Sequence, residues 1–171
     1  MRQLRAEGFL HESSAHLELV RREELFRRWR NWADRPPREA GIRFFLKGPR
    51  ALPEAIERVD GCLGLFAAAD ALGVGFVQGV PPHVYVRRLG PGVVRDSMNM
   101  APASPGEAPD LILREAPAPA SVFKGAVMKD SAPVSDIVQV WLDVASHPAR
   151  GAEQADLIHE KILERVIQGA S

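Results

Sequence analysis

Arginine is the residue type of this sequence that is best placed to do chemistry, because five arginines fall within ten residues of one another. A guanidinium group presents a planar fork of donors that matches a phosphate, and phosphate contacts supply most of the sequence-independent affinity for nucleic acid. The competing interpretation is a solvated helix face on which Glu23 and Glu24 pair with their neighbours. If the chain binds DNA, we predict that the surface contains Arg21, Arg22, Arg27, Arg28 and Arg30.

The potential nucleophiles and carboxylates lack the partners that catalysis requires. Cys62 precedes an alanine-rich segment but has no evident His and Asn or Asp arrangement, so a small packing residue is the favoured interpretation. Asp110, Glu115 and Lys124 are the nearby acid–acid–base set, and their spacing suits a nuclease-like site poorly. We predict a non-enzymatic protein with no catalytic residue and no cofactor, and a degenerate nuclease is the least favoured alternative.

The histidines do not predict a metal site. No two of them stand at a metal-ligand spacing beside a third ligand, and a single cysteine excludes a multi-cysteine zinc site. Solvated or capping roles explain them more simply. They are His11, His16, His83, His147 and His159.

A helix predicted for residues 22–32 carries most of the clustered arginines. Leu25, Trp29 and Trp32 recur at spacings of four and three and share one face, while the arginines lie mostly elsewhere. Trp29 and Trp32 are therefore expected to anchor a core or an interface rather than to stack on bases. Residues 35–37, Arg-Pro-Pro, end this helix and form a short stiff linker.

The residues before this helix predict the end of a winged-helix domain. Residues 3–10 are typical of a helix that ends at Gly8, and residues 17–20 are a predicted strand that pairs with Phe9 and Leu10. A helix followed by a hairpin is the order of the last helix and wing in such a domain. We therefore interpret residues 1–35 as a partial winged-helix remnant with a basic helix.

Residues 41–171 predict an α+β domain with a small mixed sheet and packed helices. The expected strands are residues 42–46, 84–86, 93–100 and 111–113, with an edge strand at 122–123 and 126–128. The expected helices are residues 52–59 and 65–72. Gly61 and Gly64 are expected in a turn, and the Pro- and Ala-rich residues 101–109 and 115–121 are expected in loops.

Two helices joined by a tight break are predicted for the C-terminal part of the chain. Ser135 is the expected N-cap of the first helix, and Asp136 places a carboxylate in its first turn. Pro148 stops this helix, and residues 149–151 lead into the second one.

An alternative hypothesis is that the chain is a protein-interaction or dimerisation module that does not bind DNA. The surface of the module would be the Trp29 and Trp32 face or the apolar face of the C-terminal helix pair. Its partner would be another protein or a second copy, giving a homodimer. The residues of the helix pair are Val140, Trp141, Leu157 and Ile158.

Several short motifs resemble the C-terminal domain of the AbiEi-type antitoxins, which are transcriptional regulators of abortive-infection (type IV) toxin–antitoxin systems. The C-terminal motifs are Val-Ser-Asp at 134–136, Gln139, Trp-Leu-Asp at 141–143, and Arg-Gly-x-Glu-Gln-Ala at 150–155. The resemblance continues upstream in residues 65–69, 83–86 and 110–113, so that it covers about two thirds of the chain.

The resemblance implies a non-enzymatic regulator whose functional partner is a nucleotidyltransferase-like toxin. It also implies repression of a shared promoter, with a winged helix reading the DNA and the C-terminal domain neutralising the toxin. The family carries a complete winged helix before that domain, whereas this sequence matches only its last helix and wing. The toxin-related role is therefore carried over more firmly than the DNA-binding role.

The composition is that of a soluble globular protein. The 171 residues are 46% hydrophobic and 26% charged, with no apolar run of membrane-spanning length and no signal-peptide core at the start. We therefore expect a cytoplasmic protein without a membrane partner. The net charge of zero hides an asymmetry, because residues 1–50 hold twelve Lys/Arg and seven Asp/Glu while residues 51–171 hold ten and fifteen. A basic N-terminal third is expected where one end faces a polyanion.

Overall fold

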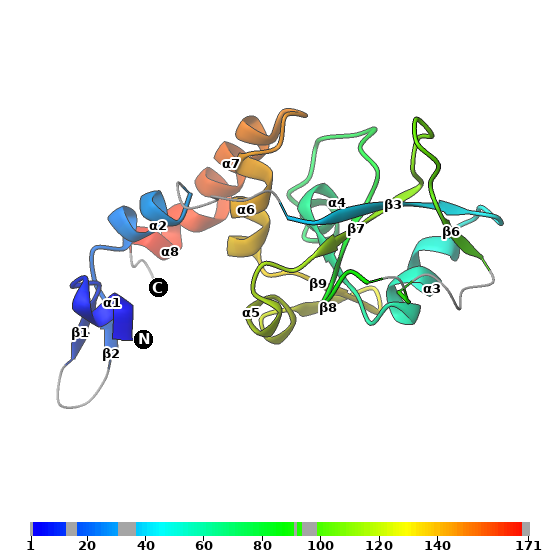
Figure 1. The fold of residues 1–171 in the computed structure, drawn as a ribbon. Coiled ribbons are helices and arrows are strands. Elements are labelled where there is room, and N and C mark those ends of the chain that lie inside the picture. Colours follow the sequence, from blue (N-terminus) through cyan, green and yellow to red (C-terminus); the bar gives the residue numbers. More distant parts are fainter. Residues whose placement is uncertain (1, 13–16, 31–36, 91, 94–98, 169–171) are drawn as a thin grey trace. The chain divides into compact units, whose positions relative to one another are not determined.

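The computed structural model describes residues 2–12, 17–30, 37–90, 92–93 and 99–168 (Figure 1). The chain divides into two compact units, one of residues 1–35 with 159–171 and one of residues 36–158. The sequence analysis also placed a boundary after residue 35, but it assigned residues 159–171 to the second domain. They join the first unit because α8 (Glu164–Gln168) packs against α2 (Arg22–Arg30). None of the described helices has the length and apolarity needed to span a membrane.

The first unit is a helix, a hairpin and a second helix, to which the end of the chain returns. α1 (Arg2–Ala6) ends before Gly8, which has a φ of +74°. β1 (Leu10–Glu12) and β2 (Leu17–Leu19) pair antiparallel, as the sequence predicted. α2 follows, and the chain comes back as the π-helical turn η1 (His159–Leu163) and α8. The apolar side chains buried in this unit are Phe9, Leu25, Phe26 and Leu163.

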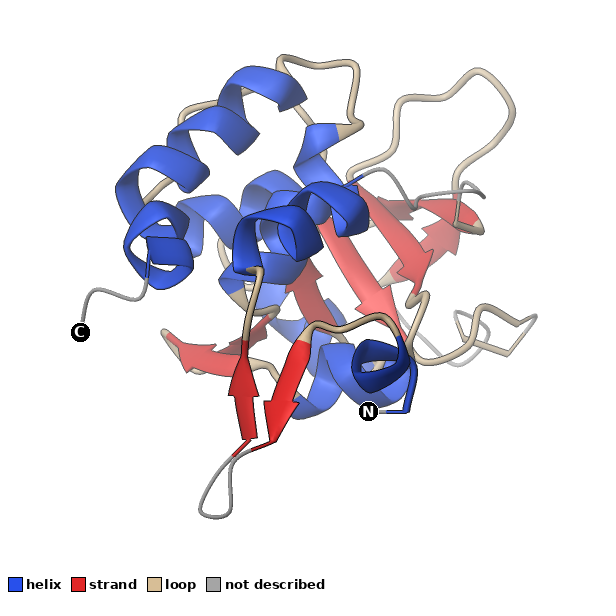
Figure 2. Ribbon diagram, turned by 90° about the vertical axis from the view of Figure 1, so that its left-hand side faces the viewer, coloured by secondary structure: helices blue, strands red, loops and turns tan. Residues whose placement is uncertain are grey.

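The described residues of the second unit form a seven-stranded mixed sheet in the order β6-β3-β7-β5-β4-β9-β8. Figure 2 draws the strands in red. β5 runs parallel to β7 and β4 runs parallel to β9, and the other neighbours are antiparallel. The predicted α+β class is therefore confirmed. The strands are β3 (Glu39–Phe44), β4 (Cys62–Gly64), β5 (His83–Val86), β6 (Met100–Pro102), β7 (Leu111–Glu115), β8 (Val127–Lys129) and β9 (Ala132–Val134).

Five helices lie in the described residues of this unit, and α6 is central among them. α6 packs against α4, α7 and strand β4. Its buried face consists of Val140, Trp141 and Val144, which recur at helical spacing. The helices are α3 (Ala51–Arg58), α4 (Leu65–Ala71), α5 (Pro119–Lys124), α6 (Ile137–Ala145) and α7 (Gly151–Ile158).

Two local predictions for this unit were wrong, and a third falls mostly outside the described residues. Residues 62–64, expected in a turn, form the fully buried strand β4, and a Cβ at Gly64 would lie 2.7 Å from the Tyr85 ring. Residues 119–124 form α5 instead of a loop and an edge strand, because Pro119 can occupy the first helical turn without losing a hydrogen bond. The predicted strand at 93–100 appears only as β6 from Met100 to Pro102, and residues 94–98 lie outside the described part of the chain.

The N-cap of α6 is Asp136 rather than Ser135. The Asp136 carboxylate accepts hydrogen bonds from the backbone N–H groups of Val138 (2.9 Å) and Gln139 (3.1 Å). Ser135 is fully buried and its backbone N–H donates to the Leu63 carbonyl at 2.9 Å. The serine thus extends the pairing of β9 with β4 by one residue, and the cap moves to the next position.

Two residues of the Arg-Gly-x-Glu-Gln motif fix α7 in place. A Cβ at Gly151 would lie 2.0 Å from the Val144 carbonyl oxygen, so α7 approaches α6 more closely than any other residue would allow. Gln154 is fully buried, donates to the Val74 carbonyl at 2.7 Å and accepts from the Phe76 N–H at 3.1 Å. The motif therefore closes a helix–helix contact and holds the loop after α4.

We expect Gly151→Ala to lower the free energy of unfolding by about 2 to 3 kcal/mol, because the added methyl group overpacks the contact between α6 and α7. Chemical denaturation measures the change. Gly48→Ala is the matched control, since nothing lies within 4 Å of a Cβ at Gly48. Equal stability of the two variants would contradict the close helix contact.

Candidate functional site

The clustered arginines of the first unit are largely engaged with groups of the same unit. The Arg21 guanidinium donates to the Glu24 carboxylate at 2.6 Å and to the Glu7 carbonyl at 3.2 Å, and it lies 5.0 Å from the centroid of the Phe9 ring. Arg22 donates at 3.0 Å to the carbonyl of Leu19 and at 3.0 Å to that of Val166. These contacts join α1, the hairpin, α2 and α8.

The remaining three arginines differ in what they contact. Arg27 pairs with Glu23 at 2.9 Å along α2, as the solvated-face interpretation expected. Arg28 pairs with Glu7 at 3.1 Å. Arg30 is exposed, and no hydrogen bond or ion pair joins it to another residue in the described ranges. It is therefore the arginine of this group that has no carboxylate partner among the described residues.

The charge asymmetry of the sequence is smaller when it is counted by structural unit. Residues 1–35 and 159–171 together hold ten Lys/Arg and eight Asp/Glu. Residues 159–171 add two of each sign, and the basic residues at positions 38–50 belong to the second unit. The first unit is therefore only weakly basic, and the predicted DNA surface depends on the local placement of its arginines.

The tryptophans proposed as interaction anchors have unequal exposure. Trp29 is half-buried, with its ring centroid 5.5 Å from that of Phe26. Trp32 lies outside the described residues. Trp141 is only 3% exposed, and Val140 and Ile158 are fully buried, so the helix-pair face belongs to the core and does not form the proposed interaction surface.

A buried polar cluster that the sequence analysis missed lies between α6 and the sheet of the second unit. Strand β5 contributes His83 and Tyr85, which are two residues apart and so share one face. β7 contributes Arg114 and α6 contributes Asp143, and Glu39 of β3 closes the cluster on its exposed side. A histidine and a tyrosine alternating with valines in an apolar strand were the available signal for this cluster.

Asp143 is the centre of this cluster. It accepts a short hydrogen bond from the Tyr85 hydroxyl and another from the Gln139 amide at 2.9 Å. The Arg114 guanidinium lies 4.0 Å from its carboxylate and donates to Glu39 at 2.7 Å. Asp143, named in the sequence as part of the Trp-Leu-Asp motif, therefore ties α6 to two strands.

Burial shapes the protonation of these groups. Burial raises the pKa of Asp143 to about 6, although its bonds with Tyr85 and Arg114 act in the opposite direction. Burial and the Asp143 charge hold the pKa of Tyr85 well above its ordinary value. Burial and the nearby Arg114 lower the pKa of His83 to about 4, so the imidazole is neutral at pH 7. His147, whose ring lies 5.9 Å from that of His83, also has a lowered pKa because of burial.

The groups of this cluster bond to one another and hold α6 against the sheet. The Tyr85 hydroxyl, the Asp143 carboxylate and the Arg114 guanidinium are already bonded to one another or to Glu39. Tyr85 is 1% exposed and His83 is 3% exposed, which leaves little room for a reacting group. The two surface pockets beside α3 are lined by other residues.

The acid–acid–base set suggested for a nuclease does not converge. Asp110 precedes β7 and Glu115 ends it, so the two residues lie at opposite ends of the strand, roughly 16 Å apart along the backbone. Glu115 accepts from the Leu89 N–H at 2.9 Å, and Lys124 is exposed at the end of α5. The geometric basis of the degenerate-nuclease alternative is therefore wrong.

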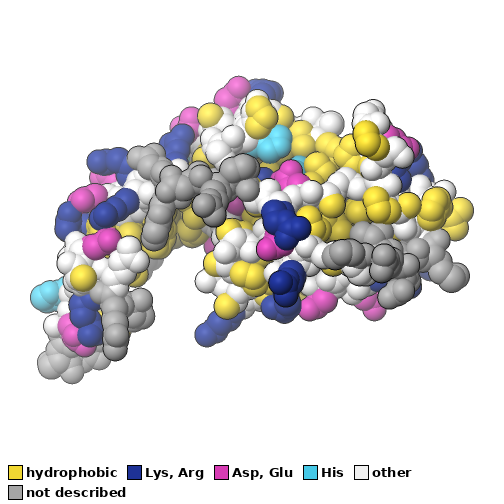
Figure 3. Space-filling view, in the orientation of Figure 1, with side chains coloured by type: hydrophobic (Ala, Val, Ile, Leu, Met, Phe, Trp, Pro, Cys, Tyr) yellow, Lys and Arg dark blue, Asp and Glu magenta, His cyan; other side chains and the backbone are white. Residues whose placement is uncertain are grey.

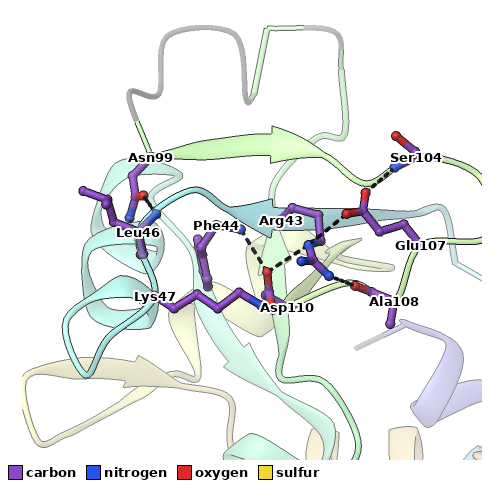
Figure 4. A network of polar contacts seen from close by, with 9 residues as sticks. All are labelled: Arg43, Phe44, Leu46, Lys47, Asn99, Ser104, Glu107, Ala108 and Asp110. Atoms are coloured by element: carbon purple, nitrogen blue, oxygen red, sulfur yellow. Dashed lines mark hydrogen bonds and ion pairs between the residues drawn. The ribbon is translucent and has the colours of Figure 1, made fainter.

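Asp110 instead fastens the end of β3 to the start of β7 (Figure 4). Its carboxylate accepts from the Phe44 N–H at 3.1 Å and from Lys47 Nζ at 2.7 Å, and Arg43 Nε lies 3.2 Å away. The hydrogen bond from Lys47 and that from the Phe44 N–H lower the pKa of Asp110 below its usual range. This network holds the backbone in place directly after β3.

Two large apolar side chains directly after β3 are exposed to solvent. Phe45 is 66% exposed and Leu46 is 76% exposed. Asn99 holds the Leu46 backbone from both sides, accepting from its N–H at 2.6 Å and donating to its carbonyl at 3.1 Å. Figure 3 shows hydrophobic side chains at the end of the second unit where Figure 1 places β3 and β6. We call these two residues the Phe45–Leu46 tip.

Cysteine and metal chemistry find no support in the described residues. Cys62 is fully buried in β4 beside Tyr85 and Val122, and burial raises the pKa of its thiol to about 11, which confirms the packing interpretation. Across residues 2–12, 17–30, 37–90, 92–93 and 99–168, no three His, Cys, Asp or Glu side chains are grouped so that they could hold a metal ion. His16 lies outside these ranges.

Comparisons of the chain with protein-family models, with curated proteins and with solved structures found no match.

Arg22→Ala is expected to lower the free energy of unfolding by about 1 to 2 kcal/mol, because it removes two charge-assisted hydrogen bonds to backbone carbonyls. Arg30→Ala is the matched control on the same helix and should change stability by less than about 0.5 kcal/mol. Urea denaturation monitored by tryptophan fluorescence measures both. A loss of stability in Arg30→Ala equal to that in Arg22→Ala would contradict the assigned contacts.

The buried, neutral His83 should make the protein less stable in acid. Its pKa is about 4 in the folded chain and 6.5 for an ordinary histidine. Its contribution to the free energy of unfolding is therefore complete above pH 6.5 and is lost as the pH falls through 4. This interval corresponds to about 3 kcal/mol. Between pH 7 and pH 4 the wild type should therefore lose about 3 kcal/mol more unfolding free energy than His83→Phe.

The control for this comparison is His11→Gln, since His11 is exposed on β1. Its stability should fall with pH in parallel with the wild type. The burial assignment fails if His83→Phe also runs parallel to the wild type across this range.

Proposed function

We propose that the chain is a non-enzymatic, antitoxin-like regulator that acts in the cytoplasm by binding a partner macromolecule through its surface. One observation carries this proposal: the side chains that could take part in a reaction are used to hold the fold. Asp143, Tyr85 and Arg114 satisfy one another beneath α6, and Asp110 fastens β3 to β7. A protein whose polar groups are committed in this way acts through its surface.

The resemblance to the AbiEi-type antitoxins supports the choice of partner. The motif residues that suggested it have structural roles in one region, since Gln139 and Asp143 belong to the polar cluster while Gly151 and Gln154 fix α7. Shared residues with structural roles are expected in proteins that share a fold. The proposed partner of the second unit is therefore a nucleotidyltransferase-like toxin.

The helix and hairpin of the first unit support a secondary role at promoter DNA. α1 followed by β1 and β2 has the order of the last helix and wing of a winged helix. Among the five arginines predicted to face DNA, Arg30 is the one with no hydrogen bond or ion pair to another described residue, so it is the best placed of the five to contact phosphate. The acidic residues Glu12 and Glu18 on the hairpin strands oppose close contact with DNA at that point.

A protein-interaction module without DNA binding is the second candidate. It is favoured by the exposed Phe45–Leu46 tip, which is held in place by Asn99 and stands out from the sheet. Exposed apolar side chains on an ordered backbone are typical of protein–protein contacts. This candidate and the antitoxin proposal agree that a protein partner contacts the second unit.

Co-expression with a nucleotidyltransferase-like toxin encoded next to this gene tests the proposal. We expect the wild-type chain to relieve the growth arrest that the toxin causes. Gly151→Ala should relieve it less, in proportion to its loss of folded protein, whereas Arg30→Ala should relieve it fully and weaken repression of a promoter reporter. Growth arrest that is the same with and without the chain would count against the antitoxin role.

A salt series of promoter binding separates the remaining alternatives. A DNA contact predicts that promoter affinity falls as salt rises and that Arg30→Ala lowers the salt slope by about one. An interaction module without DNA binding predicts no retardation of the promoter fragment at any salt concentration.

A further inference from the structure

The outer edge of β8 is an unprotected strand edge. β8 is the last strand in the sheet order, and no described strand pairs with its outer side. All three of its residues are exposed, with Val127 at 42% and Met128 at 65%. An exposed edge with apolar side chains is a template for the addition of another strand. Lys129 is the one charged residue on β8, and the strand contains no proline.

The backbone pairing of β8 shows which of its groups face outward. Met128 lies opposite Pro133 in the antiparallel ladder with β9. Proline has no N–H, and paired residues in such a ladder alternate between hydrogen-bonded and non-hydrogen-bonded positions. The Met128–Pro133 position is therefore the non-bonded one, and the N–H and C=O of Met128 point away from β9.

The turn after β8 agrees with this register. Asp130 and Ser131 have φ values of 46° and 67°, as in a two-residue hairpin turn in which both central residues are left-handed. Such a turn places Lys129 and Ala132, which are opposite each other, in the hydrogen-bonded position. Met128 therefore offers one donor and one acceptor to a strand that approaches from the open side.

A pocket of about 640 Å³ adjoins this edge and is rimmed by acidic residues. It lies beside α3 and the β8–β9 hairpin, and the Met128 side chain is part of its lining. Its charged residues are four carboxylates and one guanidinium, of which Asp60 is also paired with Arg87 at 3.2 Å. Those that line the pocket are Glu54, Glu57, Asp60, Asp130 and Arg50. The pocket therefore favours basic side chains.

We propose that the β8 edge binds an extended, basic segment of a partner protein, which adds to the sheet as an eighth strand. The Met128 backbone supplies the main-chain hydrogen bonds, and alternate basic side chains of the segment lie over the acidic pocket. This surface goes beyond the proposed function, because it is defined by the edge and its charge and does not require that the partner be a toxin.

The charge argues against the other possible occupants of this edge. A second copy paired through β8 would bring two acidic rims together, and like charges across an interface cost binding energy. Nucleic acid is repelled by the same carboxylates. A basic peptide strand satisfies both the free backbone groups and the unbalanced acidic residues.

The proposal is tested with the full chain and two fluorescein-labelled decapeptides, one alternating threonine with lysine and the other alternating threonine with glutamate. Fluorescence anisotropy at low ionic strength should show binding of the lysine peptide that is at least about tenfold tighter than that of the glutamate peptide. Added salt should weaken the lysine peptide selectively. Equal affinity for both peptides overturns the proposal.

Two substitutions at one position separate the backbone contact from side-chain packing. Met128→Pro removes the outward N–H but leaves the bonds between β8 and β9, so it should reduce affinity for the lysine peptide about tenfold or more. Met128→Ala keeps the N–H and should change affinity less than about threefold. Equal affinities of these two variants overturn the strand-addition geometry.

A charge reversal on α3 provides a test that does not depend on the fold of the β8 hairpin. Glu54→Lys combined with Glu57→Lys should invert the preference, so that the glutamate peptide binds more tightly than the lysine peptide. Sedimentation velocity of the wild type addresses the competing occupant. A dimer that Met128→Pro converts to a monomer assigns the edge to a second copy and overturns the proposal.

Discussion

The second unit depends on the burial of one carboxylate, Asp143, between α6 and the sheet. Burying an isolated charge is costly, and the cost is offset only where hydrogen bonds and an opposite charge satisfy it. Tyr85 and Gln139 donate to Asp143, and Arg114 lies near it while bonding to Glu39. Because these partners come from β5, β7, β3 and α6, one network specifies how the helix sits on three strands.

The polar groups of this network are engaged with one another, while strand edges, loops and the two pockets beside α3 face the surroundings. Large apolar side chains are left exposed at the two ends of the sheet order, in the Phe45–Leu46 tip beside β6 and in β8. The first unit follows the same rule, since Arg21, Arg22 and Arg28 join its segments through carbonyls and carboxylates. This use of the polar groups is the reason for proposing that the chain acts by surface recognition.

Local sequence signals predicted most of the helices and the hairpin. Apolar spacing predicted the helix at residues 22–30, Pro53 marked the start of the one at 51–58, and the alanine-rich composition indicated the one at 65–71. Gly8 correctly ended the first helix. The same signals failed where neighbours far along the chain decide the outcome. Residues 62–64 look like a glycine turn, yet pairing with β5 and β9 makes them a central strand. The cap of α6 moved from Ser135 to Asp136 because Leu63 takes the serine N–H into the sheet.

The sequence by itself therefore determined the α+β class, the positions of its strongest helices, the short N-terminal hairpin and the clustering of arginines. Only the tertiary structure decided that the arginines bond mainly within their own unit, that Trp141 is in the core, and that the last helix joins the first unit. It also assembled the polar cluster, in which Glu39 meets Arg114 across 75 positions and Tyr85 meets Asp143 across 58. The physical reason is that periodicity and caps act over a few residues, whereas the pairing of a buried charge depends on strands and helices that only folding brings together.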